Sequence, residues 1–333
     1  MKASNPFTQL CIDAYQGTVS SYSTGNEACI NKAVRESFFE ILGEDKITHR
    51  NWKKHKDEIY EIIEESLNLT LPNAWNESQF YNTLVEVRNG LLGVKNEFVV
   101  NDPSTLVVAE FSGNHYTTDR QKLPGKRSFS LPTSWLYIDV YDDLERFLLG
   151  ITTVQELFEK LRESFQKHID SKVYSAFVGA GAYLPAVFTE TGTFVKDNML
   201  DLIMRVQVAT GKTARIAGTK QGIAKLPTDT FWISENMKDE RHTSGRLRSW
   251  EGIETIEIPQ VFVPGTYDFK VSNTMLYILP DGSRPVKLWY EGDTRTREVT
   301  AKDADDQTVT NQVQTKVGVG VVFDNLFGTY DVV

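Results

Sequence analysis

Cysteine, long apolar runs and excess positive charge are all scarce in this chain of 333 residues. Its two cysteines, Cys11 and Cys29, show no C-x-x-C spacing and are too few for a disulfide framework, so we expect reduced thiols in a cytosolic protein. No apolar run approaches the roughly 18 residues that a membrane span needs, and the opening segment MKASNPFTQL has no apolar signal core. The sequence therefore predicts neither membrane insertion nor secretion.

The charge balance narrows the possible partners. The chain has 36 Lys and Arg residues against 45 Asp and Glu residues, which gives a net charge of −9. Proteins whose main task is to grip nucleic-acid phosphates are usually basic, because each phosphate contact needs a cation. The acidic balance argues against that class.

Catalytic motifs are also missing. The five histidines have no metal-ligand spacing, and the sequence contains no H-E-x-x-H or G-x-S-x-G motif. The segment ATGKT at 209–213 resembles part of a phosphate-binding loop, but Val206 stands where that motif needs a glycine. The order of elements there is helix, turn and strand instead of strand, loop and helix, which favours a helix C-cap at Gly211. We expect no cofactor, no metal ligand and no enzymatic activity.

The N-terminal half contains helices followed by a long β-rich excursion. A polar arm covers residues 1–30, and apolar periodicity predicts helices over about 31–42 and 51–67. Short β-type runs follow at 98–100, 106–108 and 128–141. The polar stretch between the runs carries four cations, namely Arg120, Lys122, Lys126 and Arg127. Because isolated two-stranded ribbons are marginally stable in water, this exposed excursion needs another surface to lie on.

One long helix dominates the second half. Thr153 and Glu156 form a capping box, and apolar residues then recur every three or four positions as far as Val178, before a glycine-containing stop at 179–181. About 26 residues make a rod of roughly 39 Å. Further along, the patterns predict helices at 196–209 and 220–226 and strands at 214–217, 253–263, 274–279 and 313–323. The fold class is α+β.

This order of elements resembles the major capsid protein of tailed bacteriophages, with the Hong Kong phage-type fold that encapsulins share. The resemblance covers about residues 90–333. Residues 128–143 followed by 152–178 look like the return strand of the family's E-loop running into its spine helix. Residues 198–226 look like the start of its A-domain, and the segment SGRLRSWEGI at 244–253 looks like a turn before an A-domain strand. Residues 311–330 resemble the closing P-domain strand.

The resemblance implies a division of the chain and a function. It implies an N-terminal arm and helical segment (1–90), an E-loop with flanking strands (91–150), a P-domain with the spine helix (151–194), an A-domain (195–294) and closing P-domain strands (295–333). The implied function is a structural shell that self-assembles from pentamers and hexamers, with portal and scaffolding proteins as partners. Such a shell encloses DNA without sequence-specific binding and without a membrane, and it places the protein in the virion.

The candidate assembly contacts are Arg120, Lys122, Lys126, Arg127, Trp135, Arg246 and Arg248. The cations at the tip of the excursion would meet acidic groups on a neighbouring subunit, because complementary charge sets register. Two alternatives remain open at this point: an encapsulin-type compartment shell with the same fold, and a cytosolic enzyme without a recognisable motif.

Overall fold

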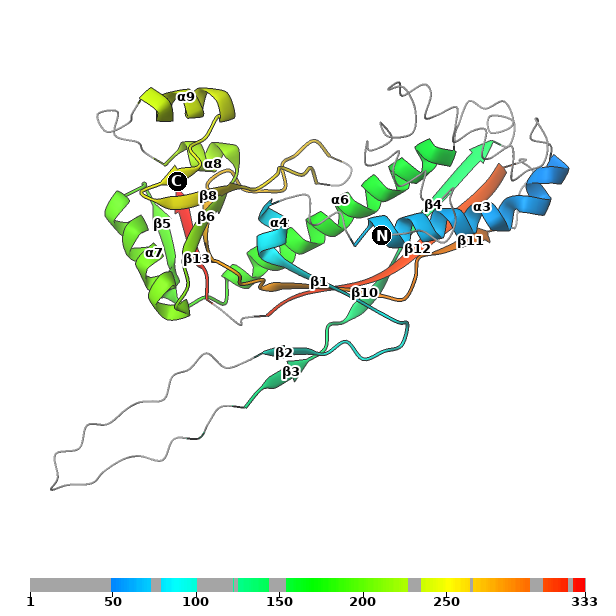
Figure 1. Cartoon of the computed structure of the whole chain (residues 1–333), viewed down its shortest axis with the longest axis horizontal. Coiled ribbons are helices and arrows are strands. Elements are labelled where there is room, and N and C mark those ends of the chain that lie inside the picture. The colour runs from blue at the N-terminus through cyan, green and yellow to red at the C-terminus, as the bar shows by residue number, and fades with distance from the viewer. Residues whose placement is uncertain are drawn as a thin grey trace.

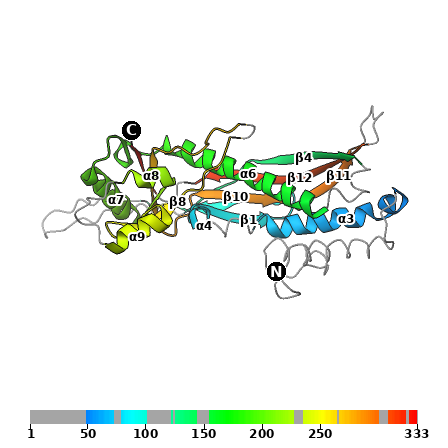
Figure 2. The same ribbon diagram turned by 90° about the horizontal axis from the view of Figure 1, so that it is seen from above.

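The computed structural model describes residues 49–72, 79–100, 122, 125–143, 154–226, 235–263, 266–299, 308–322 and 326–332. The molecule is elongated, and its two sheets lie at different places along one long helix (Figures 1 and 2). We call the five-stranded sheet and the helices that cover it the spine lobe, and the six-stranded sheet with its helices the distal lobe. The predicted helix at 31–42 and the β-run at 106–108 lie outside the described residues.

The spine lobe is built around α6 (Val154–Gly181), which confirms the long helix predicted from the periodicity. Its apolar stripe is buried, with no residue of the stripe more than 3% exposed: Leu161, Phe165, Ile169, Val173 and Phe177. The helix ends at Gly181, inside the glycine-containing stop predicted at 179–181 and three residues beyond Val178. The helix α3 (His49–Thr70) runs beside α6 (Figure 2) and confirms the second predicted helix.

The five-stranded sheet lies against α6. Its order is β1 (Val85–Gly90), β10 (Val286–Glu291), β12 (Thr308–Val321) and β11 (Arg295–Val299), and β4 (Thr133–Asp143) pairs with β12. The pair β1–β10 is parallel, whereas the pairings of β12 are antiparallel. Alternation along β10 sends Val286, Leu288 and Tyr290 into the core, and it sends Lys287, Trp289 and Glu291 to the opposite face.

The distal lobe holds the second sheet. Its strand order is β5 (Thr189–Gly192), β13 (Gly328–Val332), β9 (Met275–Pro280), β6 (Ala214–Gly218), β8 (Ile253–Glu257) and β7 (Ser249–Trp250). The helices are α7 (Lys196–Thr210), α8 (Lys220–Ala224) and α9 (Glu235–Ser244), with a short 3-10 helix η3 at Ala186–Phe188. The strand predicted over 253–263 ends at Glu257, just before Pro259, which has no backbone N–H for a sheet ladder.

The segment ATGKT is a helix end, as the element order indicated. Gly211 follows α7 with a φ of 66°, and its backbone N–H donates to Gln207 O. A left-handed residue at this position is favourable for glycine, because it has no Cβ to clash. The chain then enters β6, so Lys212 lies exposed in a connection from a helix to a strand.

The chain passes between the lobes several times. It leaves the spine lobe through α6, returns from β9 to β10, and crosses again from β12 to β13 (Figure 1). The predicted boundaries placed residues 85–90 with the N-terminal arm and residues 286–291 with the A-domain, whereas β1 and β10 pair with each other in the spine lobe. None of the helices in the described ranges is long and apolar enough to cross a membrane.

Candidate functional site

The β-rich excursion leaves the spine lobe between β1 and β4, and its two legs are joined by a short ribbon. The strands β2 (Phe98–Val100) and β3 (Arg127–Phe129) pair antiparallel, with Phe98 opposite Phe129. Figure 1 shows this ribbon below the five-stranded sheet, on the side away from α6. The surface that fixes this ribbon to the sheet is the candidate functional site.

A buried carboxylate holds both legs. Glu291, at the end of β10, accepts hydrogen bonds from the Thr133 hydroxyl at 2.6 Å and from the Gly93 backbone N–H at 3.2 Å. The Lys316 ammonium lies 2.7 Å from the same carboxylate. Gly93 belongs to the first leg and has a φ of 83°, whereas Thr133 is the first residue of β4, where the second leg returns to the sheet. We call these four residues the Glu291 clasp.

The clasp changes the acidity of Glu291. Hydrogen bonds from Lys316 and Thr133 outweigh the effect of burial, and they lower the pKa of Glu291 from 4.5 to about 2. Only 8% of the Glu291 residue is exposed. A charge held in this way is stabilised by charge-assisted hydrogen bonds, which are stronger than neutral ones. The carboxylate therefore fixes the direction in which both legs leave the sheet.

A second contact joins the legs to each other. The side-chain amide of buried Asn96 donates to Leu131 O at 2.8 Å, and its oxygen accepts the Leu131 N–H at 3.1 Å. The Leu131 side chain then lies over Gly318 and Gly320 of β12, where a Cβ at Gly320 would overlap it. Glycine at these two positions allows the second leg to approach the sheet closely.

Aromatic and charged side chains close the other end of the site. Phe98 is 1% exposed, and its ring stands edge-on to Trp289 at 6.2 Å between centroids. The Arg88 guanidinium lies 4.7 Å from the centre of the Phe98 ring, which is within the range of a cation–π contact. A Cβ at Gly90 would overlap the Trp289 ring, so this ring lies directly on β1.

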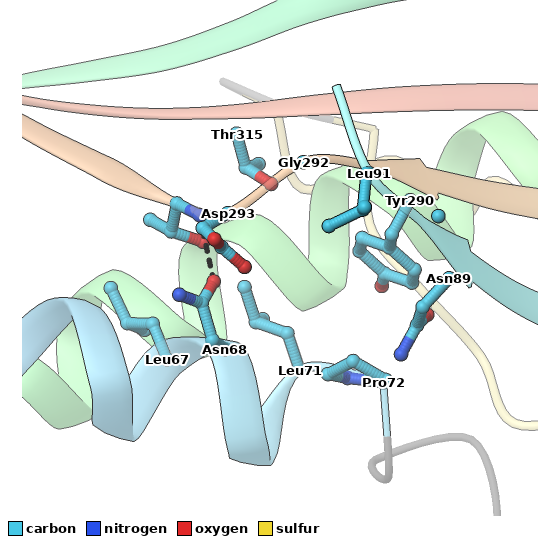
Figure 3. Close-up of a pocket in the computed structure, with 12 residues that line it drawn as sticks. Leu67, Asn68, Leu71, Pro72, Asn89, Leu91, Tyr290, Gly292, Asp293 and Thr315 are labelled. Atoms are coloured by element: carbon cyan, nitrogen blue, oxygen red, sulfur yellow. Dashed lines mark hydrogen bonds between the residues drawn. The ribbon is translucent and has the colours of Figure 1, made fainter. Parts of the chain in front are cut away.

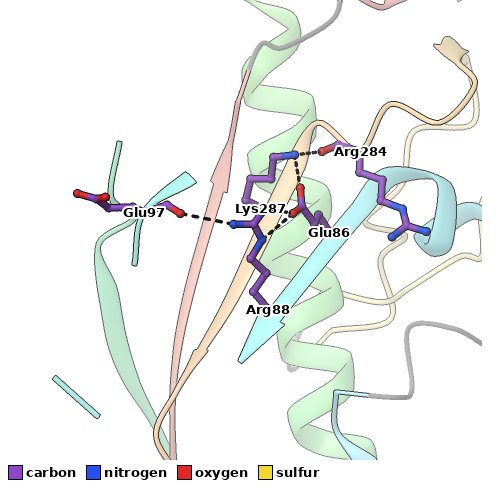
Figure 4. Close-up of polar contacts among 5 residues, drawn as sticks. All are labelled: Glu86, Arg88, Glu97, Arg284 and Lys287. Atoms are coloured by element: carbon purple, nitrogen blue, oxygen red, sulfur yellow. Dashed lines mark hydrogen bonds and ion pairs between the residues drawn. The ribbon is translucent and has the colours of Figure 1, made fainter. Parts of the chain in front are cut away.

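Figure 4 shows the ion pairs in which Arg88 takes part and those of its neighbours. The Lys287 ammonium lies 2.5 Å from Glu86 and donates to Arg284 O at 2.8 Å, while Arg88 Nε donates to Glu86 at 2.6 Å. Burial alone would raise the pKa of Glu86, but the hydrogen bonds and charges of Lys287 and Arg88 outweigh it and lower the pKa. These ion pairs join β1 to β10 and hold Arg88, whose guanidinium contacts Phe98 of the excursion.

The neighbouring cavity has no catalytic character. It has a volume of about 270 Å³ and lies between the end of α3, the end of β1 and the turn after β10 (Figure 3). Its polar lining consists of amides, hydroxyls and one carboxylate, and Asn68 accepts the Thr294 N–H at 2.7 Å there. Within the described part of the chain, no group of three or more His, Cys, Asp or Glu residues is arranged to hold a metal ion.

Comparison with known protein families identifies this architecture. Residues 6–331 match the profile of the family described as "SPbeta prophage-derived putative capsid protein YonB". The chain belongs to the YonB family of phage capsid proteins. This family is structural and non-enzymatic. A comparison with curated proteins finds no match.

Solved structures match this YonB-family chain at low sequence identity. The mature capsid protein of bacteriophage PhiM1 superposes with a TM-score of 0.52 at 11% identity, covering 77% of this chain and 87% of that one. A chain of Microbacterium phage Oxtober96 gives a TM-score of 0.49 at 12% identity, covering 77% of this chain and 91% of that one. The SrpI encapsulin of Synechococcus elongatus gives 0.39 at 15% identity, covering 62% and 75%. The PhiM1 match supports the predicted α+β capsid fold of the Hong Kong phage type.

The predicted contact residues of this YonB-family chain lie in three separate places. Lys122, Lys126 and Arg127 are all exposed on the second leg of the excursion, and Arg120 lies outside the described residues. Trp135 is 42% exposed on β4, with the Lys316 ammonium 5.8 Å from its ring centre. The structure therefore brings Trp135 next to the Glu291 clasp, to which Lys316 also belongs.

The arginines of the distal lobe are separate from this site. Arg246 donates to Thr255 O at 2.7 Å and lies 3.3 Å from Glu257, so its guanidinium braces the loop before β7 against β8 within one subunit. Arg248 is exposed nearby.

Sequence reasoning missed the Glu291 clasp. Its residues lie far apart in the chain: Gly93 and Glu291 are separated by 198 positions, and Thr133 and Glu291 by 158. The available signals were local ones, namely the alternation of Lys287, Trp289 and Glu291 along one face of a strand and the spacing of Gly318 and Gly320.

Proposed function

We propose that this YonB-family chain is the major subunit of a phage head shell, assembling from pentamers and hexamers in which the excursion of one subunit lies on the next. The observation that carries the proposal is the excursion itself. Its base is fixed to the sheet by Glu291, Asn96 and Phe98, so the ribbon projects in one direction. A ribbon held away from its own subunit is stabilised by a neighbouring surface.

Charge supports the same arrangement. Lys122, Lys126 and Arg127 are exposed on the ribbon, whereas the whole chain carries a net charge of −9. A local basic segment on an acidic protein favours contact with a second copy of that protein. Arg120 belongs to the same proposed contact. We propose that Trp135, Arg246 and Arg248 lie at further contacts between subunits.

The lobes support a specific division of the chain. In this proposal the spine lobe is the P-domain, the distal lobe is the A-domain, and residues 91–132 are the E-loop. The A-domain then holds β5 to β9 and also the returning strand β13, and β1 and β10 join the P-domain because they pair in its sheet. Residues 1–84 supply the N-terminal arm and the helical segment.

The acidic balance also suits a container. A shell that encloses DNA without gripping its phosphates leaves the genome free to be packaged and released. We propose a virion location, with portal and scaffolding proteins as partners. The match to a prophage-derived family favours the phage shell over an encapsulin-type compartment.

The direct test is the size of the purified full chain. We expect size-exclusion chromatography and electron microscopy to show closed particles or rings of five and six subunits. A protein that stays monomeric or dimeric at high concentration, alone and with its phage's scaffolding protein, would contradict the proposal.

A further inference from the structure

A short hairpin of the distal lobe presents three aromatic side chains to solvent. It spans residues 261–270, between β8 and β9, and residues 264 and 265 lie outside the described part. Lys270 N–H donates to Val261 O at 2.8 Å and Val263 N–H to Asp268 O at 2.9 Å, so the arms form an antiparallel ribbon. We call this segment the aromatic hairpin.

The rings contact one another on the ribbon. Phe262 and Phe269 stack with centroids 5.5 Å apart and an interplanar angle of 13°, and Tyr267 meets Phe262 edge-on at 6.2 Å. They nevertheless remain accessible: Phe262 is 51% exposed, Tyr267 93% and Phe269 58%. Aromatic side chains each bury about 150–250 Å² when covered, and they dominate binding at interfaces. A cluster of three on an exposed ribbon is therefore suited to binding a partner.

The base of the hairpin is rigidly fixed. The Gln260 amide donates to Val271 O at 2.9 Å and to the Asn273 side chain at 2.8 Å. Ser272 N–H donates to the hydroxyl of Tyr174 on α6 at 3.2 Å, and Val271 is buried. A protrusion held at its base loses little conformational freedom on binding, which favours association.

The composition of the hairpin selects a protein partner. Its described charged side chains are Asp268 and Lys270, whose opposite charges balance. Stacking platforms for nucleic acid combine aromatic residues with a positive groove, and interfacial membrane segments carry a basic face. The hairpin has neither feature.

The position of the hairpin indicates which protein it meets. In Figure 1 the hairpin (yellow-brown, between β8 and β9) extends on the α6 side of the molecule, whereas β2 and β3 leave on the opposite side. A contact between these two different flanks is heterologous, and heterologous contacts form a ring when their rotation closes. A two-fold contact would instead require the same patch on both partners.

We propose that the aromatic hairpin is an assembly contact, and that its partner is the flank of a second copy of this chain from which the excursion leaves, within one ring of subunits. This inference rests on the proposed shell function and adds a contact separate from the excursion.

The first test compares variants of the purified full chain. Tyr267→Asp and Phe269→Ser alter exposed side chains, so we expect melting temperatures and circular dichroism of the unassembled subunit to match those of the unaltered protein. We expect the concentration for half-assembly to rise at least tenfold, while the matched control Tyr267→Phe, which keeps the ring, assembles normally. If both variants reach half-assembly at the same protein concentration as the unaltered protein, the proposed contact is wrong.

The second test identifies the partner. A photo-crosslinking benzoylphenylalanine at position 267 should yield covalent dimers whose mass-spectrometric maps join the hairpin to residues 85–100 or 125–143 of another copy. If particles form but the crosslinks join the hairpin only to a scaffolding protein, or only to its own subunit, the inference is wrong and the shell function is unaffected. Absence of particles from the unaltered chain under every condition tried would instead contradict the shell function itself, and the inference with it.

Discussion

Replacing Glu291 with glutamine tests whether the clasp fixes the excursion. The substitution keeps the shape of the side chain but removes the charge that the Lys316 ammonium, the Thr133 hydroxyl and the Gly93 N–H all approach. Hydrogen bonds to a charged group contribute about 1.5–3 kcal/mol each, and part of that is retained by the amide oxygen. We expect Glu291→Gln to lower the free energy of unfolding of the unassembled subunit by about 2–3 kcal/mol at pH 7.

The pH dependence gives a second signature. The pKa of Glu291 is depressed from 4.5 to about 2 in the folded protein. The carboxylate therefore contributes stability that is fully present above about pH 4.5 and is lost as the pH falls towards 2. The difference between the unaltered protein and Glu291→Gln should be constant from pH 5 to 8 and should shrink below pH 4.5.

Urea denaturation at several pH values measures both effects, and hydrogen exchange locates them. The Gly93 amide should exchange faster in Glu291→Gln, because its acceptor is weakened. Glu97→Gln is the matched control: Glu97 is exposed and pairs with exposed Lys95, so its loss should cost less than about 0.5 kcal/mol. An effect of Glu291→Gln no larger than that of Glu97→Gln, or one that persists unchanged at pH 2, would refute the reasoning.

Three further predictions follow from other contacts. Lys122→Glu combined with Lys126→Glu should block particle assembly, seen by electron microscopy, without changing the melting temperature, since both lysines are exposed; normal shells would count against the charged contact. Gly320→Ala should destabilise the subunit by about 1–3 kcal/mol in urea titrations because its Cβ overlaps Leu131, whereas Gly125→Ala, with open space around it, should be near neutral. Equal effects would show that Leu131 moves freely. Burial raises the pKa of Asp170 to about 7 from 3.8, so this carboxyl costs stability as the pH rises from about 4 to 7. Asp170→Asn should remove this loss of stability, so that at pH 7 the variant's free energy of unfolding exceeds that of the unaltered protein by at most about 4 kcal/mol. If the free energy of unfolding depends on pH in the same way in both proteins, the prediction is wrong.

Local patterns predicted much of the fold but little of the site. The periodicity of Leu161, Phe165, Ile169 and Phe177 was enough to predict α6, because a buried helix repeats its apolar contacts every three or four residues. The strand β1 was missed because its six residues include three polar ones, which hide its apolar alternation. Glu86 and Arg88 pair with each other beside the base of the excursion, and Asn89 lines the cavity next to α3. The Glu291 clasp joins four separate segments, which no local pattern reveals.

The aromatic hairpin was missed for a different reason. Residues 253–263 alternate like one strand, and the alternation continues past Pro259 into the arm that carries Phe262. Sequence alternation does not show whether an apolar face will be covered by its own chain. Only the exposure of the rings in the folded subunit distinguishes the hairpin from a core strand.

The position of β13 in the distal sheet affects the order of folding during synthesis. β13 lies between β5 and β9, so these two strands share no direct pairing and are joined only when residues 328–332 insert between them. The distal lobe therefore remains incomplete on the ribosome until this late strand has emerged. A chain without residues 328–332 has no strand to join β5 to β9, so its distal lobe stays incomplete.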